Sequence, residues 1–492
     1  MVLYSCLELV TLKKELFMLL DNKNNPEFNM LNHCIKWFSF LALVLLFDCN
    51  RNIEFEESFN FTIELVSGDD QIGLQDTTLL EDIVVKVVND NGEAVSGVAL
   101  NIEITSGEGK VNNIPVVTTD NGIAKISWEL GSDYNNSMEI YVGSDKSASI
   151  VVNAIAKYKY IIPASDDDGW EIINAGDPLL NEQKAYDAID EIRKGTYRKI
   201  HSILLSVNGK LILEEYFPGT NSFGNYIEYD RYTPHELQSV NKSFRSAMIG
   251  IAIDKGFIQD ENTPISDFFP ELDYLTKDGK EAILLNHFLN MSSGLQWDEN
   301  TDLAGFYGTP FSTAHTYVLS KPIDNTPGTV FEYNTGTSFV LNRIIMNKID
   351  TDYETFARNH YSNLIESSAL PGTGEPLDFR NTPRDMLKLG QVYLNEGKWK
   401  DTQVISKRWI DESTKVHFTV SPNSSYGYQW WIRDFNTSTQ TYNCFYAAGF
   451  GGQFVFVIKE LGLVAVFTGG NFNSDMSIPY EIMENYILEA FE

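Results

Sequence analysis

The hydrophobic pattern of this 492-residue chain changes between residues 156 and 170. Before the change, short runs of alternating apolar and polar residues are separated by turn sequences. From Trp170 onward, runs with helical spacing follow runs typical of strands. The length also exceeds that of one ordinary domain. The sequence therefore predicts a β-sandwich followed by a mixed α/β domain.

The segment 54–156 is expected to form the β-sandwich, because its strand runs are short and evenly spaced. After the run 83–88, Asn89-Asp90-Asn91-Gly92 predicts a hairpin, since Asn-Gly tolerates positive φ. The stretch VNDNGEAVSGVALNIEITSGEGKV, followed by TTDNGIAKISWELGS, resembles the bacterial immunoglobulin-like (Ig-like) domains of the invasin and intimin type. Without a histidine or cysteine, the segment is interpreted as a spacer, or as a docking module for a surface partner.

Residues 157–169 are expected to link this segment to the second domain, which is expected over 170–492. The second domain begins with a predicted helix and a predicted hairpin, in 181–194 and in 203–207 with 211–216. Strand runs return after Tyr446. This order predicts a sheet whose two sequence halves meet around a central helical region.

The chain is strongly acidic, with 37 basic and 68 acidic side chains and a net charge of −31. Such a surface repels phosphate backbones, so we expect no nucleic-acid partner. Three of the four cysteines (Cys6, Cys34 and Cys49) lie in the first fifty residues, which leaves Cys444 alone in the body of the chain. The chain is therefore not a disulfide-stapled protein.

Residues 1–50 are interpreted as a leader. The uncharged run 37–47 is shorter than a membrane-spanning helix and has the length of a signal-peptide core. Cys49 follows directly and is a candidate lipidation site, although Phe47 and Asp48 stand where a bacterial lipoprotein signal has small residues. The alternatives are a lipoprotein anchored to a membrane and a plain signal peptide. Both predict an exported bacterial protein, whether periplasmic, attached to the outer membrane or secreted.

Ser239 and Lys242 lie three residues apart, within a run whose apolar residues predict a buried helix that ends at Gly256. This spacing places a hydroxyl and an amine on the same side of a helix. A serine needs such a neighbour to become a nucleophile, and a helix N-terminus favours a developing oxyanion. Alone the pair is weak evidence, since a capping serine and a surface lysine have the same spacing.

Further motifs follow Ser239-x-x-Lys242 in a fixed order along the chain. They are HFLNMSSGLQW (287–297), PGTVFEYNTG (327–336), TPRDM (382–386), YGYQWW (426–431) and AAGFGGQ (447–453). Together they resemble the serine β-lactamase-related hydrolases, and in particular class C β-lactamase-like esterases and amidases such as 6-aminohexanoate-oligomer hydrolases. The resemblance covers about 170–490 and implies a penicillin-binding-protein-type α/β domain with an antiparallel sheet and a helical subdomain.

The resemblance implies roles for particular residues. Ser239 would be the acylated nucleophile, and Lys242 with Tyr333 the proton-transfer unit. Backbone N–H groups of Ser239 and Phe450 would form the oxyanion hole. Substrate contacts are expected from four further positions, namely Thr335, Gly449, Gly451 and Trp430.

The chain departs from the family pattern at two motifs. Thr335 replaces the asparagine of Tyr-x-Asn, so an amide contact to the substrate is lost unless Asn334 compensates. Ala447-Ala448-Gly449 replaces a Lys-Thr-Gly or His-Thr-Gly motif, which removes a cation that holds the carboxylate of β-lactams. An uncharged or peptide-like ester or amide is therefore the expected substrate.

Two other functions remain open: a β-lactamase or D-alanyl carboxypeptidase-like cell-wall enzyme, and an inactive surface-binding protein. We expect no cofactor and no metal, because the Ser/Lys/Tyr scheme needs none and no ligand spacing is evident. His235 and His287 are interpreted as structural, and Asp298 with Glu299 as a polar rim of the site. The loop 302–312 is a candidate cover of the site.

Overall fold

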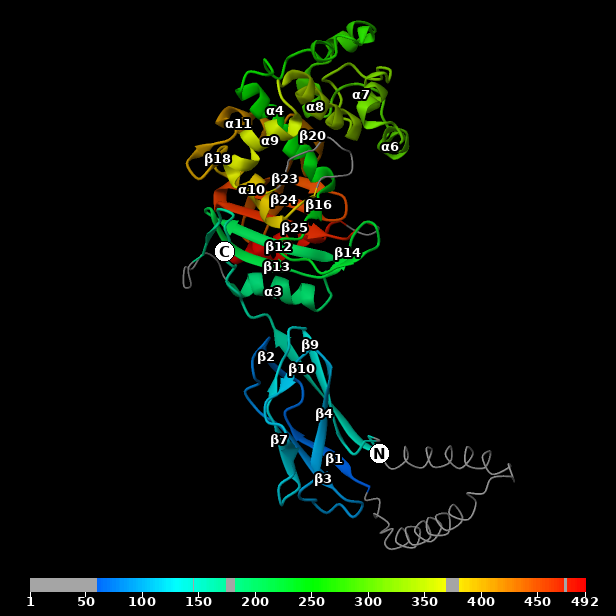
Figure 1. Cartoon of the computed structure of the whole chain (residues 1–492). Coiled ribbons are helices and arrows are strands. Elements are labelled where there is room, and N and C mark those ends of the chain that lie inside the picture. Colours follow the sequence, from blue (N-terminus) through cyan, green and yellow to red (C-terminus); the bar gives the residue numbers. More distant parts are fainter. Residues whose placement is uncertain (1–59, 145, 174–181, 369–379, 473–475) are drawn as a thin grey trace, which may run out of the picture.

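The computed structural model describes residues 60–144, 146–173, 182–368, 380–472 and 476–492. The expected leader and Cys49 lie outside these residues. In the described part of the chain, no helix combines the length and the apolar character needed to cross a membrane. Figure 1 shows a smaller β domain joined to a larger domain of strands and helices.

The β domain consists of two main sheets that share one buried cluster. One sheet has the order β1-β3-β7: β1 (Thr62–Ser67), β3 (Ile83–Val88) and β7 (Ile123–Ile126). The other has the order β2-β10-β9-β4-β6: β2 (Gln71–Leu74), β10 (Ala148–Lys157), β9 (Asn135–Val142), β4 (Ala99–Ser106) and β6 (Val116–Val117). A small third sheet pairs β5 (Lys110–Val111) with β8 (Trp128–Glu129).

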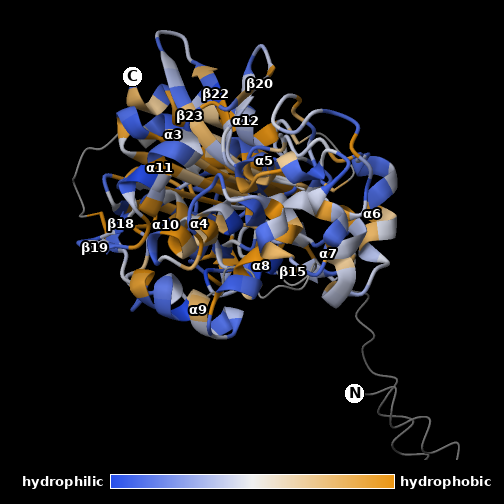
Figure 2. Ribbon diagram, turned by 90° about the horizontal axis from the view of Figure 1, so that it is seen from above, coloured by the Kyte–Doolittle hydropathy of each residue, from blue (hydrophilic) through white to orange (hydrophobic). Residues whose placement is uncertain are grey.

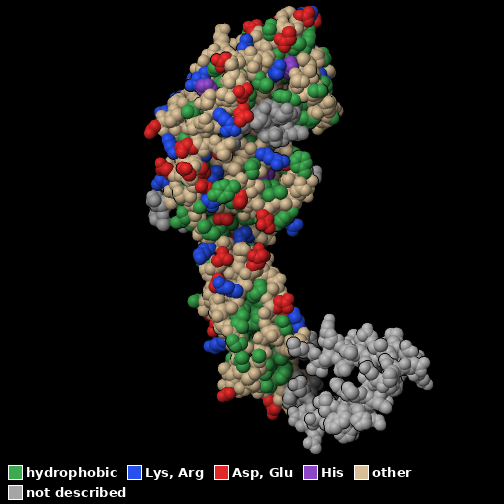
Figure 3. All heavy atoms as spheres, in the orientation of Figure 1, with side chains coloured by type: hydrophobic (Ala, Val, Ile, Leu, Met, Phe, Trp, Pro, Cys, Tyr) green, Lys and Arg blue, Asp and Glu red, His purple; other side chains and the backbone are tan. Residues whose placement is uncertain are grey.

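Alternate residues of β3 point into this cluster, since Ile83, Val85 and Val87 are fully buried. Apolar side chains also remain on the outside of the domain, as Figure 3 shows. Leu80 is 99% exposed and Ile72 is 66% exposed. The relation of this domain to the Ig-like family stays a prediction.

The hairpin turn predicted at Asn89–Gly92 is present but short, with Val88 pairing antiparallel with Ala94 across it. The chain does turn there, with Gly92 N–H donating to the Asn89 carbonyl at 2.9 Å. However, β3 pairs with β1 and β7, whereas β4 lies in the other sheet. The Asn-Gly sequence fixes the local reversal, but burial of the apolar faces selects the strand partners.

The second domain contains a nine-stranded sheet. Its order is β11 (Glu171–Ile172), β13 (Lys210–Tyr216), β12 (Ile200–Val207), β25 (Leu463–Gly469), β24 (Gln453–Ile458), β23 (Thr441–Gly449), β22 (Trp431–Asn436), β21 (Ser424–Tyr426) and β20 (Phe418–Ser421). β11 is parallel to β13, and the other neighbours are antiparallel. The predicted hairpin is β12–β13, and β12 pairs with β25, so the two sequence halves meet in one sheet. The strands return at Phe418, earlier than predicted.

Helices cover both faces of this sheet. One face carries α3 (Glu182–Arg193), α12 (Ile478–Ile482) and the π-helix η7 (Met483–Ile487) over one apolar cluster. The other face carries α4 (Asn241–Asp254) and α10 (Pro383–Leu394) over a second cluster. Figure 2 shows the hydrophobic residues concentrated between these layers.

Six further α-helices belong to the described part of this domain. They are α5 (Leu285–Leu289), α6 (Glu299–Tyr307), α7 (Phe311–Leu319), α8 (Thr335–Lys348), α9 (Tyr353–His360) and α11 (Lys407–Thr414). In Figure 1, α8 and α9 lie beside α4, and α6 and α7 lie farther out. Three short strand pairs are β14 (Gly219–Thr220) with β15 (Tyr226–Ile227), β16 (His235–Glu236) with β17 (Arg380–Asn381), and β18 (Lys398–Trp399) with β19 (Thr402–Gln403).

The expected linker contacts the second domain along its length. Tyr158 N–H donates to the Asp190 carboxylate at 2.8 Å. Arg384 of α10 donates to the Asp168 carboxylate at 2.9 Å and to the Ala164 carbonyl at 2.6 Å. Its guanidinium also binds both oxygens of the buried Glu214 carboxylate, at 2.8 and 2.7 Å. The segment after β10 is thus fixed to α3 and α10 of the second domain by hydrogen bonds to charged side chains.

Candidate active site

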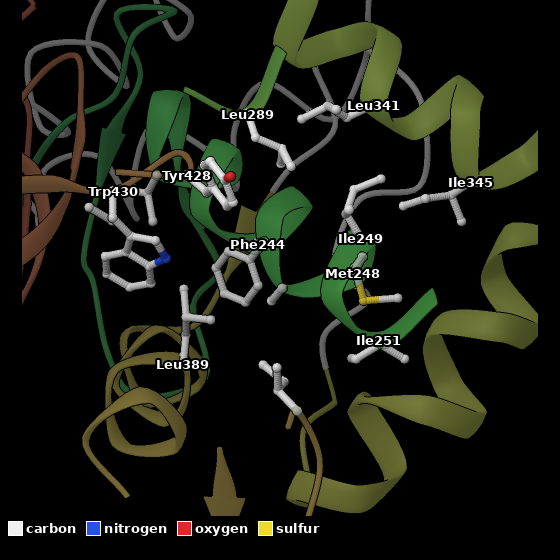
Figure 4. Close-up of a cluster of buried hydrophobic side chains, with 14 of the residues drawn as sticks. Phe244, Met248, Ile249, Ile251, Leu289, Leu341, Ile345, Leu389, Tyr428 and Trp430 are labelled. Carbon is white, nitrogen blue, oxygen red and sulfur yellow. The ribbon is translucent and has the colours of Figure 1, made fainter. Parts of the chain in front are cut away.

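Helix α4 is a rigid platform because nearly all of its residues are buried. Phe244, Met248, Ile249 and Ile251 lie in the apolar cluster of Figure 4, beside residues of α5, α8 and α10. After the helix, Gly256 has φ of +78°, a value that favours glycine and ends the helix as predicted. Ser239 lies in the short 3-10 helix η1 (Gln238–Val240), which leads directly into α4.

The hydroxyl of Ser239 contacts the amine predicted to activate it. Lys242 Nζ donates to Ser239 Oγ at 2.9 Å. Lys242 is 4% exposed, so the contact is shielded from bulk water. The same Nζ lies 4.8 Å from the centroid of the Tyr333 ring. The structure therefore brings together three residues that are separated by up to 94 positions in the chain.

Tyr333 directly precedes Asn334, the N-cap residue of helix α8. The side chain of Asn334 accepts a hydrogen bond from Thr337 N–H at 2.9 Å. Asn334 is 2% exposed and does not replace the missing asparagine as a substrate contact. The ring of Tyr333 stacks on Trp431, with centroids 6.0 Å apart and planes inclined by 19°.

Thr335 connects Lys242 to a carboxylate that the sequence placed only at the rim. Its Oγ1 accepts from Lys242 Nζ at 3.1 Å and donates to Glu299 Oε1. Its backbone N–H donates to Glu299 Oε2 at 3.0 Å, and Trp297 Nε1 donates to the same oxygen at 2.6 Å. Asp298 instead caps α6, by accepting from Asn300 N–H. The two adjacent carboxylates therefore have different roles.

The end of β23 approaches the segment before the nucleophile very closely. A Cβ added at Gly449 would lie 2.4 Å from the Leu237 carbonyl oxygen, so a larger residue does not fit there. Next to it, Gln238 has φ of +50°, a strained value for a residue with a side chain. Gly449 therefore allows the backbone of β23 to pack beside the segment that carries Ser239. The sequence analysis had instead expected Gly449 to contact the substrate.

Phe450, Gly451 and Gly452 form the turn between β23 and β24. Phe450 is 50% exposed, and its ring packs against Phe472 with centroids 5.7 Å apart. Gly451 has φ of +89°, and a Cβ there would lie 2.4 Å from the Phe472 ring. Gly451 is therefore required by the shape of the turn and lies outside the lining of the cavity.

A cavity of about 1060 Å³ opens onto Ser239. Its wall is rich in aromatic side chains, among them Phe223, Tyr307, Tyr333, Phe339, Trp431, Tyr446, Phe450 and Tyr480. The prediction that Trp430 contacts the substrate is wrong, because Trp430 is fully buried in the core of Figure 4. In a strand, neighbouring side chains point to opposite faces, so Trp431 lines the cavity instead.

Arg245, which the sequence analysis did not single out, also lines the cavity, one turn of α4 beyond Lys242. Its guanidinium donates to Ser338 Oγ at 3.5 Å and lies 4.9 Å from the centroid of the Phe339 ring. Burial lowers the pKa of Arg245 to about 10. Even so, the side chain carries its positive charge at neutral pH.

The two predicted structural histidines make contacts outside the group of Ser239, Lys242 and Tyr333, and the predicted loop is largely helical. His235 Nε2 lies 2.9 Å from His201 Nδ1 in a buried pair, and His287 Nδ1 accepts from Leu284 N–H at the start of α5. The predicted loop 302–312 consists largely of helices α6 and α7. Among the residues that the structure describes, no three His, Cys, Asp or Glu side chains are grouped as metal ligands.

The comparison with protein families decides which family this domain represents. The model of the Beta-lactamase family matches residues 192–479, more than half of the chain. The chain belongs to the Beta-lactamase family. The match includes every residue that lines the Ser239 cavity except Tyr480. Members of the Beta-lactamase family are serine hydrolases, including esterases and amidases.

Several solved structures are similar to this Beta-lactamase family domain. A family VIII carboxylesterase is 16% identical, with a TM-score of 0.50, over 65% of this chain and 99% of that one. A provisionally assigned 6-aminohexanoate-dimer hydrolase of Bacillus anthracis is 22% identical over 59% of this chain and 78% of that one, with a TM-score of 0.47. A penicillin-binding protein homologue of Caulobacter crescentus is 15% identical over 62% and 97%, with a TM-score of 0.48. None of the curated proteins compared with the chain matches it.

Proposed function

We propose that this protein is a serine hydrolase that cleaves an ester or amide bond through an acyl-enzyme on Ser239. The observation that carries the proposal is the 2.9 Å contact of Lys242 Nζ with Ser239 Oγ at a cavity of about 1060 Å³. A buried ammonium beside a hydroxyl stabilises the negative charge that develops when the hydroxyl loses its proton. The proximity of Tyr333 to the same ammonium supplies a second proton carrier.

In the proposed reaction, Ser239 Oγ attacks the carbonyl carbon while its proton passes to the Lys242/Tyr333 unit. The bond to the leaving group then breaks, and Tyr333 returns this proton to the departing alcohol or amine. Water attacks the acyl-enzyme in the second half of the reaction, its proton returns to Ser239, and the acid is released. The two groups are treated as one titrating unit because they share the same proton.

Backbone N–H groups of Ser239 and Phe450 are the proposed oxyanion hole. The support is the close approach of Gly449 to Leu237, which brings the end of β23 beside the nucleophile segment. Phe450 and Ser239 both line the cavity. One such donor typically lowers the barrier by about 3 kcal/mol.

The proposed substrate is a neutral, partly aromatic or apolar ester or amide. Ala447 and Ala448 stand where the family motif has a cation and a threonine. Ala448 lines the cavity, and the wall is rich in aromatic side chains. Aromatic side chains bind apolar groups through their faces and edges. We further propose that the protein is exported and that Cys49 carries a lipid, because an uncharged run precedes Cys49. The β domain then holds the enzyme away from the surface or docks it to a partner.

A substrate screen tests the proposal. Purified enzyme is assayed with short p-nitrophenyl esters, linear oligoamides and nitrocefin, beside Ser239→Ala as the control. We expect hydrolysis of the esters or amides at least 100-fold faster than that of nitrocefin, and none above background by Ser239→Ala. Efficient nitrocefin turnover would favour a β-lactamase, and inactivity on every substrate would favour a binding protein.

A further inference from the structure

Glu299 stands behind the three residues of the proposed reaction. We propose that Glu299 is a positioning residue, which holds the Lys242 side chain aimed at Ser239 through the hydroxyl of Thr335. The inference rests on the proposed function, because it assigns a role in the same site. It goes beyond that function in adding a carboxylate to the proton-transfer unit.

The orientation of the Glu299 carboxylate is fixed on both oxygens. Oε1 accepts from Thr335 Oγ1, and Oε2 accepts from Thr335 N–H at 3.0 Å and from Trp297 Nε1 at 2.6 Å. The three donors come from two segments of the chain, the one before α6 and the start of α8. These donors hold the carboxylate in one orientation.

The direction of the hydrogen bonds shows how Lys242 is held. Thr335 has a single hydroxyl proton, which it gives to Glu299, so its lone pairs are free to accept from Lys242 Nζ at 3.1 Å. Lys242 therefore donates to Thr335, and Thr335 donates to the Glu299 carboxylate. This leaves the ammonium another N–H for Ser239 Oγ.

The charge of Glu299 also acts on other groups around the cavity. The titratable and charged groups that line the cavity with it are Glu236 of β16, Lys242 and Arg245 of α4, Tyr307 of α6, Tyr333 before α8, Tyr446 of β23 and Tyr480 of α12. Its charge also reaches Tyr426 of β21. Burial raises the pKa of Tyr307 and Tyr426, and the charge of Glu299 raises both further. The same negative charge stabilises every proton on the Lys242/Tyr333 unit.

A purely structural role for Glu299 makes a different prediction. If Glu299 only tied α6 to α8, its replacement would weaken the fold or lower the rate at all pH values alike. A charge that acts on the proton-transfer unit instead sets the pH at which this unit gains and loses protons. The pH dependence of the reaction therefore distinguishes the two.

The test compares kcat/KM from pH 5 to pH 10 for the wild type, Glu299→Gln and Asp302→Asn, with a p-nitrophenyl ester. Asp302 is the matched control, because it lies on the same helix and pairs with Lys321 instead of Thr335. Loss of the Glu299 charge makes nearby protons easier to lose, so both limbs of the Glu299→Gln profile should move to lower pH by about one unit. The Asp302→Asn profile should overlay that of the wild type.

A second pair of variants tests the hydroxyl in the middle of the series. Thr335→Ser keeps the hydroxyl, and its kcat/KM should stay within about threefold of the wild type. Thr335→Val removes the hydroxyl, and kcat/KM should fall about 10- to 100-fold, as expected for the loss of a hydrogen bond to a charged group. Equal losses in the two variants would contradict the proposal.

The outcomes separate the failure of this inference from that of the proposed function. If the wild type hydrolyses esters but the limbs of the Glu299→Gln profile do not move, Glu299 is a structural tie and the inference is wrong. If the wild type hydrolyses no ester or amide, the proposed function fails first and the inference falls with it. A shift in Glu299→Gln that Asp302→Asn does not share supports both.

Discussion

The two histidines beside the nucleophile segment show what burial does to single residues. His235 Nδ1 faces the Glu236 carbonyl at 3.2 Å and therefore carries the proton, so its Nε2 accepts from His201 Nδ1–H. Burial lowers the pKa of His235 to about 4 and that of His201 to about 3. Both rings are neutral at pH 7 and serve as a structural pair, as the sequence analysis expected of His235.

This pair predicts a loss of stability in acid. Because the folded-state pKa of His235 lies below 6.5, the unfolded chain binds a proton between pH 6.5 and 4 that the folded chain does not. The contribution of His235 is complete above pH 6.5 and is lost as the pH falls toward 4. From pH 7 to pH 5, His235→Gln should lose about 2 kcal/mol less of its unfolding free energy than the wild type.

Urea unfolding at pH 7, 6 and 5 measures this difference. His360→Gln is the control, because His360 is only partly buried on α9 and should change the slope with pH much less. Identical slopes for the wild type and His235→Gln would show that the pair takes up protons in the folded state.

Among single residues, the sequence predicted the contacts that depend only on spacing along one helix. Ser239 and Lys242 are three residues apart, so one helical turn brings them together, and the structure has them in contact. The Thr335–Glu299 contact joins residues 36 positions apart and depends on how α6 packs beside α8. A departure from the Tyr-x-Asn motif marked Thr335, but nothing in the sequence pointed from it to Glu299.

The main element-scale feature of the site is the contact between η1 and the end of β23. A strand end and the first turn before α4 lie close enough to exclude a single Cβ at Gly449. This contact sets the separation between the backbone of Ser239 and that of Phe450. The precision of the site therefore depends on two elements that come from distant parts of the chain.

Gly449→Ala should accordingly damage activity more than stability. Its Cβ would meet backbone at Leu237 at 2.4 Å, so β23 must move away from η1. A displacement of about 1 Å at a catalytic group can cost about 100-fold in rate, and we expect kcat to fall by about that factor. The measurement is kcat per folded enzyme, with the fold checked by circular dichroism.

Gly209→Ala is the matched control. Gly209 has φ of +83° in the β12–β13 turn with open space around it, so an alanine there strains the backbone far from the cavity. It should lower the melting temperature and leave kcat unchanged. If Gly449→Ala behaved in the same way, the contact of β23 with η1 would not set the site.

Predictions of helices and strands succeeded where an element and its pairing partner are adjacent in the sequence. The hairpin β12–β13 and helix α3 were predicted from periodicity alone, and both are present. The loop expected over 302–312 is largely helical, because Asp298 caps α6 and the aromatic side chain of Phe306 is buried beneath it. The turn at Asn89–Gly92 was predicted, but the sequence did not indicate that β3 and β4 lie in different sheets, because strand partners depend on contacts between distant segments.

At the scale of the whole molecule, the segment 157–169 is a fixed connection. Asp190 of α3 and Arg384 of α10 bind it, and Glu214 of β13 in turn binds Arg384. The sequence indicated two domains from the change in pattern, but it gave no sign of how the connection is anchored. The acidic side chain of Asp168 finds its partner, Arg384, 216 positions away.

The central claim is that one hydroxyl in this molecule is reactive, that of Ser239. The direct measurement is intact-protein mass after incubation of the full chain with a fluorophosphonate probe, followed by peptide mapping. The account predicts one adduct per chain, located on Ser239 and absent from Ser239→Ala. An unlabelled wild type, or an adduct on any other residue, would contradict it.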